Sequence, residues 1–265
     1  HRPSLLLLLF LEGKPHPREI IGGHEARPHS CPYMAFIQFL VEEKNHRCGG
    51  VLVRQDFVLT AAHCWGSSIK VTLGAHNIQK QERTQQVISV KKAIPHPDYN
   101  PKNLANDIML LKLEREAKLT AAVRTLSLPW GTGQVRPGEM CHVAGWGRVT
   151  PNGIAPDTLQ EVELTVQQDR VCESCLRNYN SNTQLCGGDP KQKKSSFKGD
   201  SRGPLVCENV IQGIVSYGQN NGKPPRAFTK VSSFLPWIKE TMKKPLALGM
   251  SQSSLELIQK HPATK

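Results

Sequence analysis

The chain has 265 residues, of which 38% are hydrophobic and 21% are charged, as in a soluble globular protein. This length suits one large all-β domain or two small ones. The 34 Lys and Arg against 22 Asp and Glu give a net charge of +12, which favours anionic partners, and we expect affinity for glycosaminoglycan or proteoglycan. Aromatic residues make up only 6% and no nucleic-acid-binding motif accompanies the charge, so nucleic acid is not an expected partner.

The N-terminal segment contains an apolar run, Leu5 to Leu11, preceded by His1 and Arg2. The run is too short to cross a bilayer, which takes about 20 residues, but it suits the hydrophobic part of a secretory signal. The alternative is a buried strand. Residues 12–19 are polar and rich in proline. We therefore expect residues 1–19 to be a signal and activation peptide, and the protein to enter the secretory pathway without stable membrane insertion.

From Tyr33 to about Leu128, short apolar runs alternate with turns, and a second set of runs continues to Val231. This spacing predicts an all-β sandwich or barrel. The runs are 34–40, 50–53, 57–62, 69–73, 87–90 and 108–113 in the first set, and 140–145, 160–166, 204–207, 212–217 and 227–231 in the second.

The last periodic segment, residues 234–242, has the apolar spacing of a helix and basic residues near its end. It predicts a C-terminal α-helix at about 232–243. Residues 244–265 are polar with scattered Leu and Ile, and we expect them to form a disordered tail.

Three short stretches carry residues that could act together in nucleophilic catalysis. His63 follows an apolar run and precedes a cysteine, Asp107 opens another apolar run, and Ser201 lies in a turn-forming stretch, 199–205, of sequence Gly-Asp-Ser-Arg-Gly-Pro-Leu. A serine hydroxyl is a weak nucleophile until a base removes its proton, and an imidazole titrates in the useful range. Each stretch alone is weak evidence, since Gly-Asp-Ser is also an ordinary turn sequence.

Together these stretches make residues 20–243 resemble the trypsin/chymotrypsin-like serine proteases, whose triad follows the same chain order of His, Asp and Ser. The segments 20–25 (Ile-Ile-Gly-Gly-His-Glu), 73–78 (Leu-Gly-Ala-His-Asn-Ile) and 196–201 (Ser-Phe-Lys-Gly-Asp-Ser) place the resemblance in the granzyme branch of the family. The fold that the resemblance implies is two packed six-stranded antiparallel Greek-key β-barrels, at about 20–128 and 129–231, followed by the C-terminal helix.

The resemblance also assigns roles to residues around Ser201. His63 would be the general base and Asp107 would orient it, while the backbone N–H groups of Gly199 and Ser201 would form the oxyanion hole. After removal of residues 1–19, the new ammonium group of Ile20 would pair with Asp200. A buried carboxylate needs such a compensating charge.

The primary specificity pocket follows from the same alignment. Ser195 would form its floor, Ser216, Tyr217 and Gly218 its wall, and Arg226 would point into it. A guanidinium in a partly desolvated slot selects a carboxylate, so we expect cleavage after Asp, with Glu second. Lys198, beside the oxyanion loop, could favour an acidic residue elsewhere in the substrate. The alternative for Arg226 is a solvated loop cation.

Eight cysteines in an exported chain favour disulfides, and the resemblance implies the pairs Cys48–Cys64, Cys141–Cys207 and Cys172–Cys186. Cys31 and Cys175 are then left over. The sequence Cys172-Glu-Ser-Cys175 offers a redox or zinc CxxC as an alternative, but the chain has no second CxxC, and its ten histidines show no ligand spacing. No metal or cofactor is expected.

One residue departs from the family pattern, in which Gly-Gly-Pro follows the serine. Here Arg202 precedes Gly203 and Pro204. A β-carbon, a long side chain and a charge at this position could displace the nucleophile loop. The competing hypothesis is therefore a catalytically impaired, basic binding or antimicrobial protein on a protease scaffold. As a protease, the chain would be a monomer of the cytolytic granule or the extracellular space, with protein substrates and serpin-type inhibitors as partners.

Overall fold

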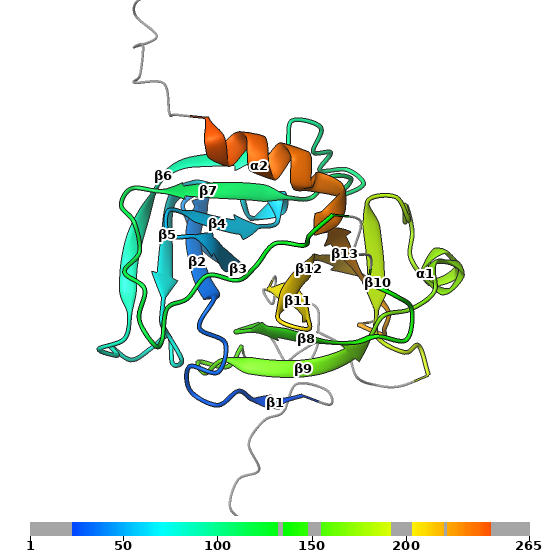
Figure 1. Cartoon of the computed structure of the whole chain (residues 1–265), viewed down its shortest axis with the longest axis horizontal. Coiled ribbons are helices and arrows are strands. Elements are labelled where there is room, and N and C mark those ends of the chain that lie inside the picture. The colour runs from blue at the N-terminus through cyan, green and yellow to red at the C-terminus, as the bar shows by residue number, and fades with distance from the viewer. Residues whose placement is uncertain (1–22, 132–134, 148–154, 192–202, 220–221, 245–265) are drawn as a thin grey trace, which may run out of the picture.

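The computed structural model describes residues 23–131, 135–147, 155–191, 203–219 and 222–244. These residues form two antiparallel β-sheets, one built from each predicted set of strands (Figure 1). The first is a closed barrel in the order β2-β3-β4-β7-β6-β5. Its strands are β2 (Met34–Val41), β3 (Lys44–Arg54), β4 (Phe57–Thr60), β5 (Ser67–Leu73), β6 (Gln86–Pro95) and β7 (Met109–Leu113).

The second sheet has seven strands in the order β1-β9-β8-β11-β12-β13-β10. The isolated bridge between Val166 and Gly187 brings the end of β9 back to β10, so that six of the strands curl into a ring and β1 lies outside it. The strands are β1 (His24–Glu25), β8 (Met140–Gly145), β9 (Gln160–Thr165), β10 (Gln184–Gly187), β11 (Pro204–Cys207), β12 (Val210–Gly218) and β13 (Arg226–Lys230).

The main apolar core lies in the first barrel and also includes residues of β11 and β12, and a second core lies within the second sheet. The first core includes Ile37, Leu59 and Leu110, all fully buried. The second is smaller and centres on Phe228, also fully buried.

Two helices and two 3-10 turns complete the described part. The turns are η1 (Ala62–Cys64) and η2 (Val231–Phe234), and the helices are α1 (Asp169–Cys175) and α2 (Leu235–Lys243). Helix α2 buries Leu235 and Ile238 against the first core, so residues 235–243 connect the second sheet back to the first barrel (Figure 1).

The sequence patterns missed three elements, β1, β10 and α1. β1 has only two residues, both exposed. β10 has only four residues, all buried, and includes the polar Gln184, so it has no alternating pattern. α1 buries only Cys172, which a disulfide joins to Cys186 in β10. The packing of α1 therefore comes from a covalent link rather than from an apolar face.

All three disulfides implied by the resemblance are formed: Cys48–Cys64, Cys141–Cys207 and Cys172–Cys186. Cys31 and Cys175 are free thiols. Burial raises the pKa of the Cys31 thiol above its ordinary value.

Candidate active site

His63 lies where β4 ends and the chain turns into η1. The strand stops at Thr60, two residues earlier than the apolar pattern predicts, and Cys64 N–H donates to the Ala61 carbonyl at 3.1 Å. The disulfide between Cys64 and Cys48 of β3 ties this turn to the barrel. The imidazole is therefore held on a rigid element, with its side chain 13% exposed.

Asp107 is completely buried and makes two hydrogen bonds with His63. The Nδ1 atom of His63 lies 2.6 Å from Asp107 Oδ2, and the His63 backbone N–H donates to Asp107 Oδ1 at 3.0 Å. The two residues are 44 positions apart in the sequence. This arrangement fixes the ring and makes Nδ1 the protonated nitrogen of the neutral imidazole, since a carboxylate can only accept.

Two hydroxyl groups of the second sheet also form hydrogen bonds with Asp107, and the triad motif did not indicate them. Ser216 Oγ donates to Asp107 Oδ2 at 2.5 Å, and Thr229 Oγ1 donates to the Asp107 carbonyl at 2.8 Å. Ser216 lies at the irregularity of β12 between Val215 and Tyr217, where a bulge can redirect a side chain. The sequence contains no signal for this contact, because Ser216 is 109 residues from Asp107.

These contacts decide the protonation of Asp107. Burial by itself opposes ionisation, but the hydrogen bonds from His63 and Ser216 and the attraction of His63 outweigh it and hold the pKa of Asp107 below its ordinary value. The buried group is therefore a carboxylate that stabilises positive charge on His63. Within the described ranges, the other ring nitrogen, Nε2 of His63, has no hydrogen-bond partner.

Several predicted site residues lie outside the described ranges: Ser201, Gly199, Ser195, Lys198, and the activation pair Ile20 and Asp200, as does Arg202. The chain is described again from Gly203. A β-carbon on Gly203 would lie 2.0 Å from the Ala144 carbonyl oxygen, and the Gly203 carbonyl accepts a hydrogen bond from Val215 N–H at 3.2 Å. The backbone two residues after Ser201 is thus packed directly against β8.

Arg226 is the first residue of β13 and is only 7% exposed. It lies between two glycines of the neighbouring strands, Gly218 of β12 and Gly187 of β10. The guanidinium carbon of Arg226 is 3.1 Å from the position of a β-carbon on Gly218. Its side chain therefore lies along the segment predicted as the pocket wall, and the alternative of a solvated loop cation does not fit this burial.

The wall continues into an open groove of about 400 Å³. The groove is lined by parts of two loops and by the end of β12: Lys102, Asn103, Leu104, Cys175, Leu176, Arg177, Asn178, Tyr217, Gly218 and Gln219. The Tyr217 hydroxyl donates to the Arg177 carbonyl at 3.0 Å. A peptide extending from a pocket beside Gly218 would have both apolar and cationic surface here.

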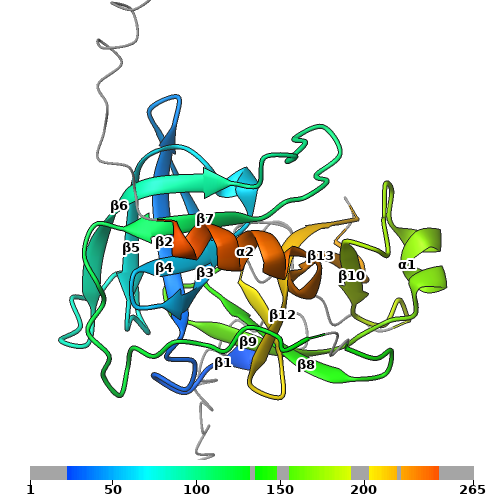
Figure 2. The ribbon, with the colours of Figure 1, turned by 45° about the horizontal axis from the view of Figure 1, so that its top comes forward.

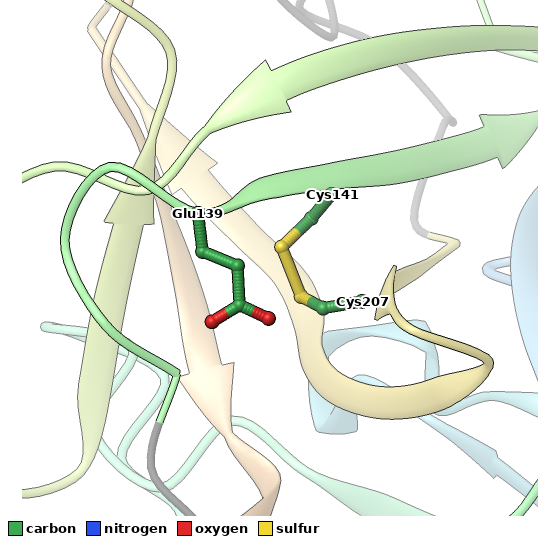
Figure 3. A group of neighbouring side chains, drawn as sticks. All are labelled: Glu139, Cys141 and Cys207. Carbon is green, nitrogen blue, oxygen red and sulfur yellow. A yellow bond between two sulfur atoms is a disulfide. The ribbon is translucent and has the colours of Figure 1, made fainter.

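One group of potential metal ligands occurs among the described residues, namely Glu139, Cys141 and Cys207 (Figure 3). The two sulfur atoms are bonded to each other. Since a metal is bound by thiolates and not by a disulfide, only the Glu139 carboxylate remains as a ligand. This group is not a metal site.

Comparison with known proteins agrees with the resemblance. The trypsin family profile matches residues 20–238. The chain belongs to the trypsin family of serine proteases. It is 64% identical to human granzyme B over 92% of this chain and 99% of that protein, and 63% identical to human granzyme H over 92% and 99%. Mouse cathepsin G is 58% identical, over 92% of this chain and 93% of its own length.

A solved structure described as "Structure of GrC" covers 85% of this chain and all of its own, with 60% identity and a TM-score of 0.82. The granzyme-like members of the trypsin family are therefore its relatives in both sequence and fold. Membership implies a hydrolase that acts on proteins. In the part of the chain that the structure describes, no helix has the length and apolarity needed to span a bilayer.

Proposed function

We propose that this trypsin-family chain is a granzyme-like serine endopeptidase that hydrolyses peptide bonds after Asp, with Glu second. The observation that carries the proposal is the His63–Asp107 pair, in which Nδ1 is engaged by a buried carboxylate at 2.6 Å and Nε2 is left for a nucleophile. Ser201 is the residue proposed for that role.

In the proposed reaction, the Ser201 hydroxyl oxygen attacks the carbonyl carbon while His63 Nε2 takes its proton. The N–H groups of Gly199 and Ser201 bind the oxyanion. The C–N bond then breaks, His63 gives the proton to the leaving amine, and an acyl-enzyme remains. Water attacks the ester with His63 again as base, and the Ser201 hydroxyl is restored. Throughout, the carboxylate of Asp107 stabilises the imidazolium.

Arg226 is proposed to cause the preference for Asp, and Ser195 is proposed to form the floor of the pocket. The burial of Arg226 beside Gly218 supports this role, since a cation held along the pocket wall selects an anionic side chain. The wall residues Ser216, Tyr217 and Gly218 all belong to β12, next to β13. Lys198 is proposed to favour a further acidic residue of the substrate.

Activation is proposed to follow removal of residues 1–19, when the Ile20 ammonium pairs with Asp200. The next described residues support a docked N-terminus. β1 pairs with β9, and Ala26 N–H donates to the Leu159 carbonyl at 2.9 Å. Residues 24–26 are thus fixed on the same sheet that carries β11.

The proposal extends to the setting of the enzyme. Its net charge of +12 supports binding to anionic glycosaminoglycan or proteoglycan. Its similarity to granzymes supports residence in a cytolytic granule or outside the cell as a monomer that serpin-type inhibitors control.

The decisive experiment uses the chain beginning at Ile20. It is titrated with a serine-reactive phosphonate and assayed with a tetrapeptide thioester ending in Asp, beside Arg202→Gly and Ser201→Ala. Labelling and turnover in the native sequence, both lost in Ser201→Ala, are expected. Activity that appears only in Arg202→Gly would instead support the impaired binding protein. Faster turnover of Ala, Leu, Phe or Lys substrates than of Asp would overturn the specificity.

A further inference from the structure

A second groove, of about 510 Å³, lies on the outer side of barrel one between β5, β6 and the segment that follows η1. Six of its lining residues matter here: Trp65, Ile69, Lys70, Val90, Lys91 and Lys92. Trp65 comes two residues after His63, so this groove begins beside the candidate active site.

Trp65 is held with its ring outward. A β-carbon on Gly66 would lie 2.4 Å from the Leu40 carbonyl oxygen, so the backbone at this residue is pressed against β2. The Trp65 N–H donates to the Ala62 carbonyl at 3.1 Å. Its side chain is 56% exposed. An exposed indole offers a large contact area and has few rotatable bonds to order on binding.

The charged side chains that line this groove are all positive. Lys70, Lys91 and Lys92 are all exposed, and none of the described residues that line the groove carries a carboxylate. A strand normally turns successive side chains to opposite faces, but the register of β6 shifts between Val90 and Lys92, so both neighbouring lysines reach solvent. The groove thus combines three cations with apolar surface.

We propose that this groove is an exosite for an acidic segment of the protein substrate, located on the C-terminal side of the cleaved bond. The inference rests on the proposed protease function. The groove beside Tyr217 and Gly218 lies next to Arg226, and we assign it to the substrate residues that precede the bond. β5 and β6 lie at the opposite end of the molecule from α1 and β10 in both views (Figures 1 and 2). The substrate residues that follow the cleaved bond, on the far side of His63, would therefore contact Trp65 and the three lysines.

A peptide fits this surface better than a sulfated glycan. Carboxylates of Asp or Glu would pair with the lysines, and an apolar side chain between them would cover Trp65 and Val90. A polysaccharide with charge along its whole length would use the lysines but leave this apolar surface poorly matched.

The test compares the activated chain with Lys70→Glu/Lys91→Glu and with Trp65→Ala. The control is Lys80→Glu/Lys118→Glu, which changes two exposed lysines outside the groove and lowers the net charge by four, as the double groove variant does. The substrates are a tetrapeptide thioester ending in Asp and two protein substrates with the same cleavage sequence, followed by either an acidic or a neutral segment. Binding of a fluorescein-labelled acidic peptide to the full-length chain is measured by anisotropy.

The native enzyme should cleave the acidic-tailed protein about tenfold faster than the neutral one, as kcat/KM, and this preference should fall with added salt. The groove variants should lose the preference and the anisotropy signal while keeping tetrapeptide turnover, and the control should keep all three.

Two results would overturn the exosite without affecting the protease proposal. One is that the native enzyme cleaves both proteins equally while it turns over the tetrapeptide normally. The other is that the control variant loses the preference and the anisotropy signal as much as the groove variants do. If no substrate is cleaved, the protease proposal fails, and peptide binding still tests the groove. Loss of binding to heparin, but not to peptide, in the groove variants would identify a glycan site and overturn the proposal.

Discussion

The Arg226 side chain lies directly against Gly218, with its guanidinium carbon 3.1 Å and its Cγ 3.2 Å from the point where a β-carbon would stand. The two residues face each other in the β12–β13 ladder. A β-carbon at 218 would therefore make the arginine side chain shift by a few tenths of an ångström, whereas the backbone conformation of Gly218 in β12 does not call for glycine. Two predictions follow from this contact.

Replacement of Arg226 by Gln should lower kcat/KM for Asp substrates by about 100-fold, because the amide keeps hydrogen-bond donors but removes the charge that pairs with the substrate carboxylate. Arg226→Lys should retain part of the activity, because it keeps the charge without the bidentate geometry. The assay is steady-state cleavage of paired Asp and Asn tetrapeptides. Equal rates for the two peptides in the native enzyme would contradict the role of Arg226.

Replacement of Gly218 by Ala should reduce Asp turnover by about fivefold through displacement of the guanidinium. Gly187→Ala is the matched control on the other side of Arg226. Its β-carbon would meet Phe228 Cε2 at 3.4 Å and no atom closer, which is ordinary contact. It should therefore leave kcat/KM within about twofold of native. Equal effects of both substitutions would show that the contact does not position Arg226.

Replacement of Asp107 by Asn should lower kcat by about 10³- to 10⁴-fold, because the amide favours the wrong tautomer of His63. Ser216→Ala removes one of the hydroxyl donors to Asp107 and should cost about threefold to tenfold. Rates are measured with the Asp thioester over a pH series. An unchanged rate in Asp107→Asn would contradict the proposed role of Asp107 in orienting His63.

The lowered pKa of Asp107 also predicts a dependence of stability on pH. The folded protein binds the proton of this group less tightly than the unfolded chain does, so the stabilisation is complete above the unfolded pKa of about 4. It is lost as the pH falls through the lower, folded pKa. The difference in unfolding free energy between native protein and Asp107→Asn should therefore shrink below about pH 4, as measured by urea denaturation. A difference that grows on acidification would contradict the assignment.

Replacement of Gly203 by Ala should destabilise the protein by about 2 kcal/mol or more, because the Ala144 carbonyl 2.0 Å from the new atom is backbone and cannot move alone. Thermal unfolding beside Gly187→Ala measures the effect. A Tm of Gly203→Ala equal to that of the native protein would show that β8 can move to make room for the new β-carbon. Since Gly203 is held this tightly, the chain after Arg202 has little freedom to absorb strain, and Arg202→Gly is expected to raise kcat/KM.

The sequence predicted most strands from apolar runs. It predicted the C-terminal helix at about 232–243, whereas α2 begins three residues later, at Leu235, after the 3-10 turn η2, and ends at Lys243. It extended β4 into the segment of His63, because Ala61 and Ala62 are apolar although they belong to a turn. It missed β1, β10 and α1, which are held in place by long-range strand pairing and, for α1, by a disulfide. Local patterns carry no information on such contacts.

The motifs identified the family and its candidate triad, because these depend on residue types in a fixed chain order, and the resemblance to that family implied the cysteine pairs. Only the tertiary structure decided that Ser216 and Thr229 hold Asp107, that Arg226 lies buried between two glycines, and that Trp65 and three lysines share one groove. These relationships join residues that are far apart in the chain. They exist because closing the first barrel and curling the second sheet bring the ends of separate strands together.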